Sequence, residues 1–377
     1  MNYAELALKK HKELKGKIAV ALKDSLDSQE KLSIYYTPGV AAVSSYVAEH
    51  PEQARDYTWL NNSVAVVSDG SAVLGLGDIG PYGALPVMEG KCMLFKHFAG
   101  IDAVPIVLDV HSADEIVAAV KAIAPSFGGI NLEDIAAPIC FEVEERLKAE
   151  LSIPVFHDDQ HGTAVVVLAG LINAMNVTGR QLRDAKIVVA GAGAAGTAII
   201  KLLHAYAKPR MFAVDSKGVI SASRKDLNNE KRKLLKYTNL SGIDGSLGDI
   251  LQGADVFIGV SKSGLLTADM VKSMDKNPII FAMANPIPEI MPAEARKAGA
   301  SVVATGRSDF PNQVNNALAL PGIFRGALDN RVRQITLDHK IAAAEAIASL
   351  TDKPTSDRII TEVLDTRLVN AVAAVIK

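Results

Sequence analysis

The sequence has few of the features that mark specialised protein classes. Its 377 residues include two cysteines, Cys92 and Cys140, which are too few for a disulfide framework or a cysteine zinc site. The longest apolar run, from Ala164 to Met175, is interrupted by Asn173 and is too short to span a bilayer. No apolar stretch of the signal-peptide type follows the lysines near the N-terminus. We therefore expect a protein of the reducing cytoplasm without a membrane partner.

An excess of charge of one sign is also missing. Forty lysines and arginines oppose 42 aspartates and glutamates, so we expect no general attraction to nucleic acid or to an anionic membrane. Hydrophobic residues make up 49% of the chain and charged residues 22%, as is usual for a soluble globular protein. A chain of this length exceeds what one core of ordinary size organises, so we expect two domains.

The first part of the chain alternates between short apolar runs and helix-like segments. We predict strands at 64–67, 103–109, 129–132 and 154–156, and helices at 3–15, 86–98, 113–123 and 141–151. The glycine-dense stretch 74–83 lies before the second of these helices. Strands that alternate with helices indicate an α/β domain with largely parallel pairing. We assign residues 1–160 to this N-terminal domain.

The second part, residues 161–330, has five apolar strand candidates. They lie at 186–190, 211–214, 256–259, 279–283 and 302–305, and most are separated by helix-compatible segments. This pattern matches a doubly wound, Rossmann-type nucleotide-binding sheet. The alanine-rich segments 338–350 and 357–376 are helical in pattern. We expect residues 331–377 to form a C-terminal helical segment that packs back on the domains.

A glycine-rich turn carries the clearest ligand signal. The sequence Gly191-Ala192-Gly193-Ala194-Ala195-Gly196 directly follows a predicted strand and opens a predicted helix, 197–206. In a dinucleotide site the first glycine permits the turn, the second lets the backbone approach the pyrophosphate, and the third permits close helix–strand packing. The helix N-terminus offers free N–H groups to the phosphates. Such turns also occur as plain tight connections, but this context favours a dinucleotide cofactor.

An acidic residue bears on the choice between NAD and NADP. Asp215 lies 19 residues after Gly196, at the end of the next strand. A carboxylate there accepts hydrogen bonds from the adenosine ribose and repels a 2′-phosphate. Lys217 and Arg224 follow closely and would neutralise such a phosphate, although they also fit ordinary surface cations. We expect NAD, with NADP as the alternative.

Two acidic pairs follow strands of the first domain, Glu133-Asp134 and Asp158-Asp159. Because the carboxyl ends of parallel strands line the ligand crevice, these groups can converge there. Their mutual repulsion would raise their pKa values unless a cation lay among them, and an all-oxygen ligand set suits Mg²⁺ or Mn²⁺. Taken singly, each acid also fits a helix cap or a solvated charge. Packing or hydrogen bonding suits the neighbouring histidines, His157 and His161, better than metal ligation.

Other polar residues are candidates for the chemistry. A lysine in apolar surroundings near a divalent cation has a lowered pKa, which makes Lys91 a candidate general base. Tyr36, on the Pro-Gly turn at 35–39, is a candidate proton donor. Asn285 follows a strand of the second domain and points to the same crevice, as do Asn315 and Asn316 less directly. By pattern alone, solvated or packing roles fit the lysine and the tyrosine as well.

At these residues the sequence resembles the malic enzyme family, specifically its short bacterial form. The matching stretches run in order along about three quarters of the chain. They are 35–40, 67–70, 74–80, 89–91, 131–135, 156–163, the glycine fingerprint, 284–286 and 311–316.

The resemblance implies a role for each matching residue. Tyr36 matches the proton donor and Lys91 the general base, and Asp158 matches the aspartate that orients or assists the lysine. The divalent-metal ligands are matched by Glu133, Asp134 and Asp159. Asn285 and Asn315 match the asparagines near the nicotinamide and the substrate.

The implied reaction is the oxidative decarboxylation of L-malate to pyruvate and carbon dioxide with reduction of NAD(P)⁺. Neutral Lys91 would take the C2 hydroxyl proton, Mg²⁺ or Mn²⁺ would polarise the new carbonyl, and Tyr36 would protonate C3. Three alternatives stay open. They are a malolactic enzyme, which retains NADH and releases lactate, a metal-independent NAD(P)-dependent dehydrogenase of related architecture, and a non-catalytic NAD-sensing regulator.

One stretch departs from the family pattern. The larger eukaryotic form carries a substrate-binding arginine where this sequence reads Asp69-Gly70-Ser71-Ala72-Val73. Another cation must therefore meet a malate carboxylate. The family forms dimers or larger assemblies, so the resemblance alone implies a homodimer or a higher homo-oligomer.

Overall fold

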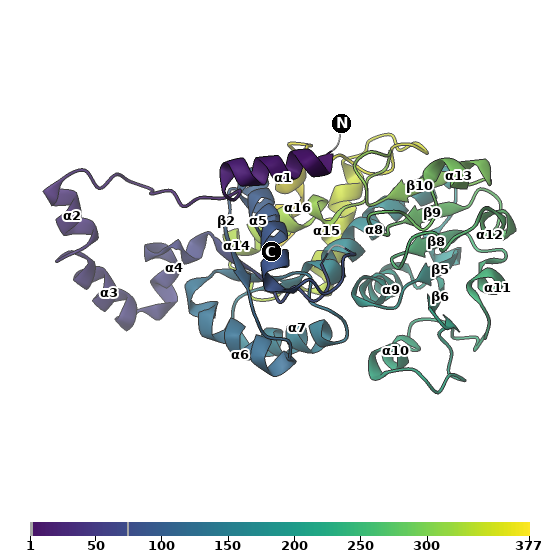
Figure 1. Cartoon of the computed structure of the whole chain (residues 1–377), viewed down its shortest axis with the longest axis horizontal. Coiled ribbons are helices and arrows are strands. Elements are labelled where there is room, and N and C mark those ends of the chain that lie inside the picture. The colour runs from purple at the N-terminus through teal and green to yellow at the C-terminus, as the bar shows by residue number, and fades with distance from the viewer. Residues whose placement is uncertain (1–2, 74) are drawn as a thin grey trace.

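Two largely parallel β-sheets organise the chain, and one long helix joins them (Figure 1). The computed structural model describes residues 3–73 and 75–377. Leu74, in the glycine-dense stretch, lies outside the described residues. A four-stranded sheet is formed by the first part of the chain and a six-stranded sheet by the second. The predicted α/β class with a Rossmann-type second domain is confirmed.

The first sheet has the strand order β2-β1-β3-β4, with all pairs parallel. Its strands are β1 (Ser63–Ser68), β2 (Asp102–Val107), β3 (Gly129–Leu132) and β4 (Val155–His157). Successive residues of β1 pack into two different cores, Val64 against the side of α5 (Gly80–Ala99) and Ala65 against the side of α6 (Ala113–Ile123) and α7 (Ile139–Glu150). Helices therefore cover both faces, which explains the continuous apolar runs of these strands.

The second sheet has the order β10-β9-β8-β5-β6-β7, and only β7 pairs antiparallel. Its strands are β5 (Lys186–Ala190), β6 (Arg210–Asp215), β7 (Gly218–Val219), β8 (Val256–Gly259), β9 (Ile279–Ala282) and β10 (Val302–Thr305). The accompanying helices are α9 (Ala194–Ala207), α10 (Asn229–Leu234), α11 (Leu247–Leu251), α12 (Ala268–Ser273) and α13 (Pro292–Lys297). The strand order reverses between β5 and β8, which is where doubly wound sheets bind their ligands.

Helix α8 (Asp158–Thr178) joins the two sheets and crosses the predicted boundary at residue 160. It packs on α9 and on α15 (Leu337–Ser349). Within the described part of the chain it is the one helix long and apolar enough to cross a membrane, but 67% of its most apolar window is buried inside the fold. Its composition is that of a core helix.

The C-terminal segment returns to the first sheet. Helix α14 (Leu320–Asp329), which the sequence placed in the second domain, packs on α5 and on α16 (Leu368–Ala373). The prediction of a helix over 357–376 is wrong except for α16. Asp365 there accepts hydrogen bonds from the Thr361 hydroxyl and the Arg367 backbone N–H, and such side-chain bonds compete with helix formation.

The N-terminal region forms an arm that projects from the body (Figure 1). After α1 (Tyr3–Leu14), the chain runs outward to α2 (Gln29–Tyr35) and α3 (Val40–Glu49), and returns through α4 (Ala54–Tyr57). None of these four helices has a buried residue. The sequence predicted α1 and the turn at 35–39 but not the arm.

Candidate active site

Lys91 lies buried between two carboxylates. Its Nζ atom donates a hydrogen bond to Oδ2 of Asp158 at 2.6 Å and lies 3.0 Å from Oε1 of Glu133. Each of these three residues is less than a tenth exposed. Burial by itself lowers the pKa of Lys91, but the charges of Asp158 and Glu133 outweigh it and raise this pKa. The lowered lysine pKa expected from the sequence requires a divalent cation nearby and stays a prediction.

The sheet register brings the acidic residues together. Leu132 of β3 is the parallel partner of His157 of β4, so Glu133 and Asp158 leave the sheet side by side. Asp158 and Asp159 are the first residues of α8. Gly162 makes room for the first of them, because a Cβ atom at this position would lie 1.8 Å from Oδ1 of Asp158. The predicted convergence of acids at one edge of the sheet is what the geometry shows.

Glu133, Asp134 and Asp159 form a candidate metal centre. One carboxylate oxygen from each lies within 4.8 Å of the others. Burial, together with the charges of Asp158, Asp159 and Asp134, raises the pKa of Glu133 well above its usual value against the opposing effect of Lys91. A divalent cation would relieve this repulsion, and carboxylate oxygens are the ligands that Mg²⁺ and Mn²⁺ prefer. The donor set therefore fits such an ion.

The glycine turn has the geometry expected of a dinucleotide site. Gly191 has a φ of +117°, and a Cβ atom there would lie 2.6 Å from the carbonyl oxygen of Val260. A Cβ atom on Gly196 would lie 1.8 Å from the carbonyl oxygen of Gly191, whereas one on Gly193 would meet nothing within 4 Å. Helix α9 begins at Ala194. The open space at Gly193, next to free N–H groups of a helix N-terminus, suits a pyrophosphate.

Asp215 ends β6, as predicted, but its carboxylate is already paired. Oδ1 and Oδ2 accept hydrogen bonds from Arg224 at 2.8 and 3.1 Å, and Oδ2 accepts one from Lys231 at 2.6 Å. These bonds outweigh the effect of burial and lower the pKa of Asp215 to about 2. The sequence analysis named Arg224 as a nearby cation but missed Lys231, which lies 16 residues after Asp215.

The predicted asparagines occupy different positions. Asn285 lies exposed on the loop after β9, and its carbonyl oxygen would lie 2.5 Å from a Cβ atom on Gly75. The glycine-dense stretch therefore touches the nucleotide-binding domain here. Oδ1 of Asn315 accepts a hydrogen bond from the Ala317 N–H, whereas Oδ1 of Asn316 lies 3.5 Å from Nζ of Lys91. Adjacent asparagines give no pattern that distinguishes these two roles.

Two further polar residues support the site. Nδ2 of Asn131 donates a hydrogen bond to Oε2 of Glu133 at 2.9 Å. The sequence analysis missed Asn131, although a polar residue in a buried strand was a usable signal. The ring of His161 lies 2.8 Å from Oε2 of Glu144, which is the hydrogen-bonding role expected of it.

Tyr36, the predicted proton donor, does not lie next to Lys91 within one chain. It follows α2 on the arm, and 67% of it is exposed. Figure 1 shows α2 far from α5, which carries Lys91.

The architecture and site can be compared with known proteins. The family profile of the malic enzyme N-terminal domain matches residues 15–148, and that of the malic enzyme NAD binding domain matches residues 160–376. The chain belongs to the malic enzyme family. A bifunctional malic/malolactic enzyme of Bacillus subtilis is 56% identical over 99% of this chain and 92% of its own length. An NAD-dependent malic enzyme of Geobacillus stearothermophilus is 55% identical over 95% and 75%.

Solved structures of malic enzymes share the fold. The NAD-dependent malic enzyme of Thermotoga maritima superposes with a TM-score of 0.95 at 51% identity and covers 98% of both chains. The malic enzyme of Pyrococcus horikoshii gives 0.92 at 46% identity and covers 98% of this chain and 89% of its own. The family resemblance inferred from the sequence is confirmed.

Proposed function

We propose that the protein catalyses the oxidative decarboxylation of L-malate to pyruvate and carbon dioxide, with NAD⁺ or NADP⁺ as the oxidant. The observation that carries this proposal is the position of Lys91. It lies between Asp158 and Glu133, and Glu133 is also part of the carboxylate cluster suited to a divalent cation. A base beside a metal site is what the removal of a hydroxyl proton and the subsequent loss of carbon dioxide require.

The residues of the chain divide the chemistry between them. Mg²⁺ or Mn²⁺, held by Glu133, Asp134 and Asp159, would supply Lewis-acid polarisation of the substrate oxygen. A divalent cation held by Glu133 would offset one of the two negative charges that keep the proton on Lys91, so Lys91 could then act as the base. Asp158, bonded to Nζ at 2.6 Å, orients the amine toward the C2 hydroxyl. The coenzyme would bind across the glycine turn 191–196, with Asn285 and Asn315 near the crevice.

A second copy of the chain provides a route for Tyr36 to take part. The arm exposes apolar side chains that a monomer leaves in water, among them Val20 at 96%, Leu22 at 78% and Ile34 at 55% exposure. Apolar surface of this kind marks a protein interface. We place the arm against a second copy in a homodimer or higher homo-oligomer, where Tyr36 would reach the partner's crevice and protonate C3 of the enolate.

The test is a steady-state assay with L-malate. We expect NAD(P)H and pyruvate to form in equal amounts with Mn²⁺, and neither to form with a chelator present. The proposal would be refuted if no NAD(P)H and no pyruvate formed with Mn²⁺ and either coenzyme.

A malolactic reaction is the second candidate, because a relative named for both activities is 56% identical. Release of lactate without free NADH would identify it. The expected coenzyme is NAD, and the expected compartment is the cytoplasm, where the two free, buried cysteines would stay reduced.

A further inference from the structure

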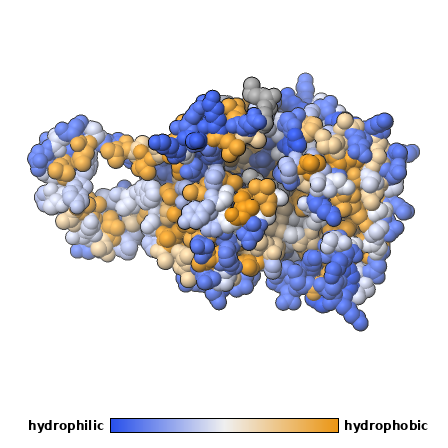
Figure 2. Space-filling model, in the orientation of Figure 1, coloured by the Kyte–Doolittle hydropathy of each residue, from blue (hydrophilic) through white to orange (hydrophobic). Residues whose placement is uncertain are grey.

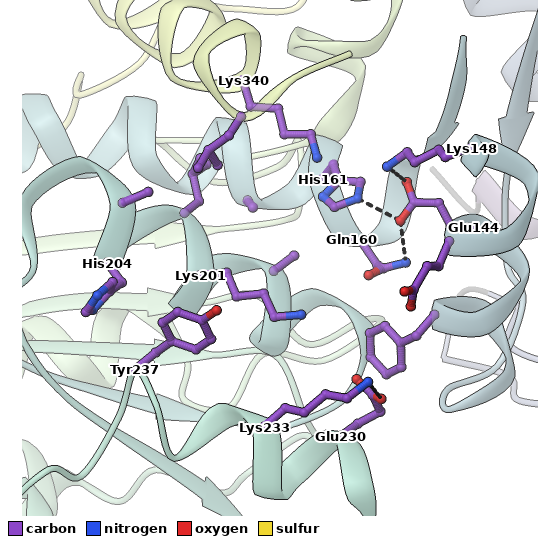
Figure 3. A pocket seen from close by; sticks show the side chains of 17 residues that line it. Glu144, Lys148, Gln160, His161, Lys201, His204, Glu230, Lys233, Tyr237 and Lys340 are labelled. Atoms are coloured by element: carbon purple, nitrogen blue, oxygen red, sulfur yellow. Dashed lines mark hydrogen bonds and ion pairs between the residues drawn. The ribbon is translucent and has the colours of Figure 1, made fainter. Parts of the chain in front are cut away.

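A cavity of about 590 Å³ lies between the two halves of the molecule (Figure 3). Its walls are formed by α7 of the first domain, the first turns of α8, helices α9 and α10 of the nucleotide-binding domain, and α15. None of its lining residues belongs to the lysine–carboxylate site, the metal centre or the glycine turn. The cavity is therefore distinct from these three sites, although the hydrogen-bonded pair Glu144 and His161 forms part of its wall.

Four lysines line this cavity, and two of them have no anionic partner. Lys148 is bonded to Glu144 at 2.5 Å, and Lys233 to Glu230 at 2.7 Å. Within residues 3–73 and 75–377, the side chains of Lys201 and Lys340 make no hydrogen bond or ion pair. Figure 3 shows Lys340 extending into the cavity from α15 and Lys201 from α9.

Lys340 is the unusual member, because it is only 8% exposed. Its Nζ atom lies 5.9 Å from the ring centroid of Phe156, a cation–π contact. Burial, followed by the charge of Lys148, lowers the pKa of Lys340 to about 7, and the charge of Lys201 acts in the same direction against Glu144. A buried ammonium group without an anionic partner is unfavourable.

Both carboxylate oxygens of the nearby Glu144 already have hydrogen-bond partners. Its two oxygens accept hydrogen bonds from Lys148, Gln160 and the backbone N–H of His157, and Oε2 lies 2.8 Å from Nε2 of His161. These contacts fill its acceptor positions. Of the other two acids that line the cavity, Glu230 is paired with Lys233, and Glu145 is exposed and forms no hydrogen bond or ion pair within the described chain. Lys340 and Lys201 are thus two cavity lysines without an anionic partner among the described residues.

We propose that this cavity binds a small anionic metabolite, whose phosphate or carboxylate groups are held by Lys340 and Lys201. A bound anion favours the protonated form of Lys340. Both ammonium groups then supply charge-assisted hydrogen bonds, which are among the strongest that proteins make to such anions. The volume exceeds that of a bare ion, so the anion is one group of a larger molecule. Because α7 comes from the first domain and α9 from the second, the bound molecule bridges the two domains.

Isothermal titration calorimetry on the full chain, saturated with NAD, tests this with inorganic phosphate and succinate as probes. We expect one of them to bind once per chain, phosphate if the natural ligand is phosphorylated and succinate if it is a carboxylic acid. Lys340→Met and Lys201→Gln should each weaken this binding about tenfold or more. The control Lys353→Met, at an exposed lysine outside the cavity, should bind as the wild type does.

Two results would overturn the proposal. One is that neither probe binds the wild type at millimolar concentration. The other is that Lys340→Met and Lys201→Gln bind as tightly as Lys353→Met, which would place the anion elsewhere. Lys340→Met removes an unpaired buried charge, so we expect it to fold, and its circular dichroism spectrum checks this. Binding is measured without turnover, so the outcome is independent of the proposed reaction.

Discussion

The backbone N–H of Asp134 donates a hydrogen bond to Oδ2 of Asp159 at 2.8 Å. Asp134 has a φ of +53°, a left-handed conformation that is uncommon for residues other than glycine. One oxygen of Asp159 thus fixes the loop after β3, while the other is left for a metal ion. A hydrogen bond therefore connects the two predicted ligands. A substitution that keeps this hydrogen bond can test metal binding without disturbing the folding of the loop.

Asp159→Asn should weaken Mn²⁺ binding severely while the protein stays folded. The amide oxygen still accepts the Asp134 N–H, but the negative charge at the metal centre is lost. Mn²⁺ titration followed by electron paramagnetic resonance measures the affinity. Asp109→Asn is the matched control, because Asp109 is an exposed acid after strand β2, at the opposite edge of the same sheet from β4. Full activity of Asp159→Asn in low micromolar Mn²⁺ would exclude this residue as a ligand.

Lys91→Ala should lower malate turnover by a factor of about 10² or more, because the base for alcohol oxidation is removed. It also leaves Asp158 and Glu133 buried without their cation, so we expect a lower Tm that Mn²⁺ raises more than it does in the wild type. Lys96→Ala, on the exposed side of the same helix, should change neither quantity much. Equal turnover by the two variants would remove Lys91 from the mechanism.

Tyr36→Phe should block pyruvate formation but leave the reduction of oxaloacetate by NADH, since protonation at C3 follows decarboxylation. If the tyrosine is supplied by a second copy, mixing inactive Tyr36→Phe with inactive Lys91→Ala chains restores complete sites. In randomly reassorted dimers we expect about a quarter of the wild-type rate. No recovery in verified mixed dimers would show that Tyr36 and Lys91 act within one chain or that Tyr36 is not needed.

Asp215→Ser should shift coenzyme use toward NADP. The carboxylate now pairs with Arg224 and Lys231, and its removal frees both cations to meet a 2′-phosphate. The measurement is the ratio of kcat/KM for NADP to kcat/KM for NAD, which should rise for Asp215→Ser. Asp269→Ser, an exposed acid on α12 paired only with Lys272 in the described chain, should leave the ratio unchanged. A ratio that stays constant in both variants would mean that Asp215 does not set the preference.

Lys340→Met should stabilise the protein near pH 7 in the absence of anions, by on the order of a few kcal/mol. The pKa of Lys340 is lowered from 10.5 to about 7, so between these values the unfolded chain binds more protons than the folded one. The stability of the wild type therefore rises with pH across this window relative to that of the variant. In thermal melts from pH 6 to pH 10, the difference in Tm between Lys340→Met and the wild type should shrink as the pH rises. A difference in Tm that does not change with pH would argue that Lys340 keeps its usual pKa.

The strands were the most predictable part of the fold. The predicted limits of β3, β5, β8 and β10 agree with the structure, because these strands are short, mostly apolar and buried. The start of α5 was missed by six residues, since Gly80, Pro81 and Gly83 look like a loop. The arm was missed because its helices bury nothing, and apolar periodicity is the signal by which helices are predicted.

The site could be predicted by residue type but not by electrostatics. The acidic pairs stood at strand ends, and the parallel sheet brought them together as expected. The pKa of Lys91 depends on Asp158, which is 67 residues away in the sequence, and on how closely the two side chains approach. The pairing of Asp215 with Lys231 is of the same kind. Such distances follow from tertiary packing, which composition and spacing do not encode.

Helix α8 limits how the two domains can move. It carries Asp158 and Asp159 in its first turn, and its buried middle packs on α9, whose N-terminus borders the glycine turn. A continuous, buried helix does not bend easily, so the pivot of any domain closure must lie in other segments that cross between the sheets. Motion of α8 along its axis would displace Asp159, one of the three proposed metal ligands, together with α9. The proposed metal site and the coenzyme site are therefore coupled through one rigid helix.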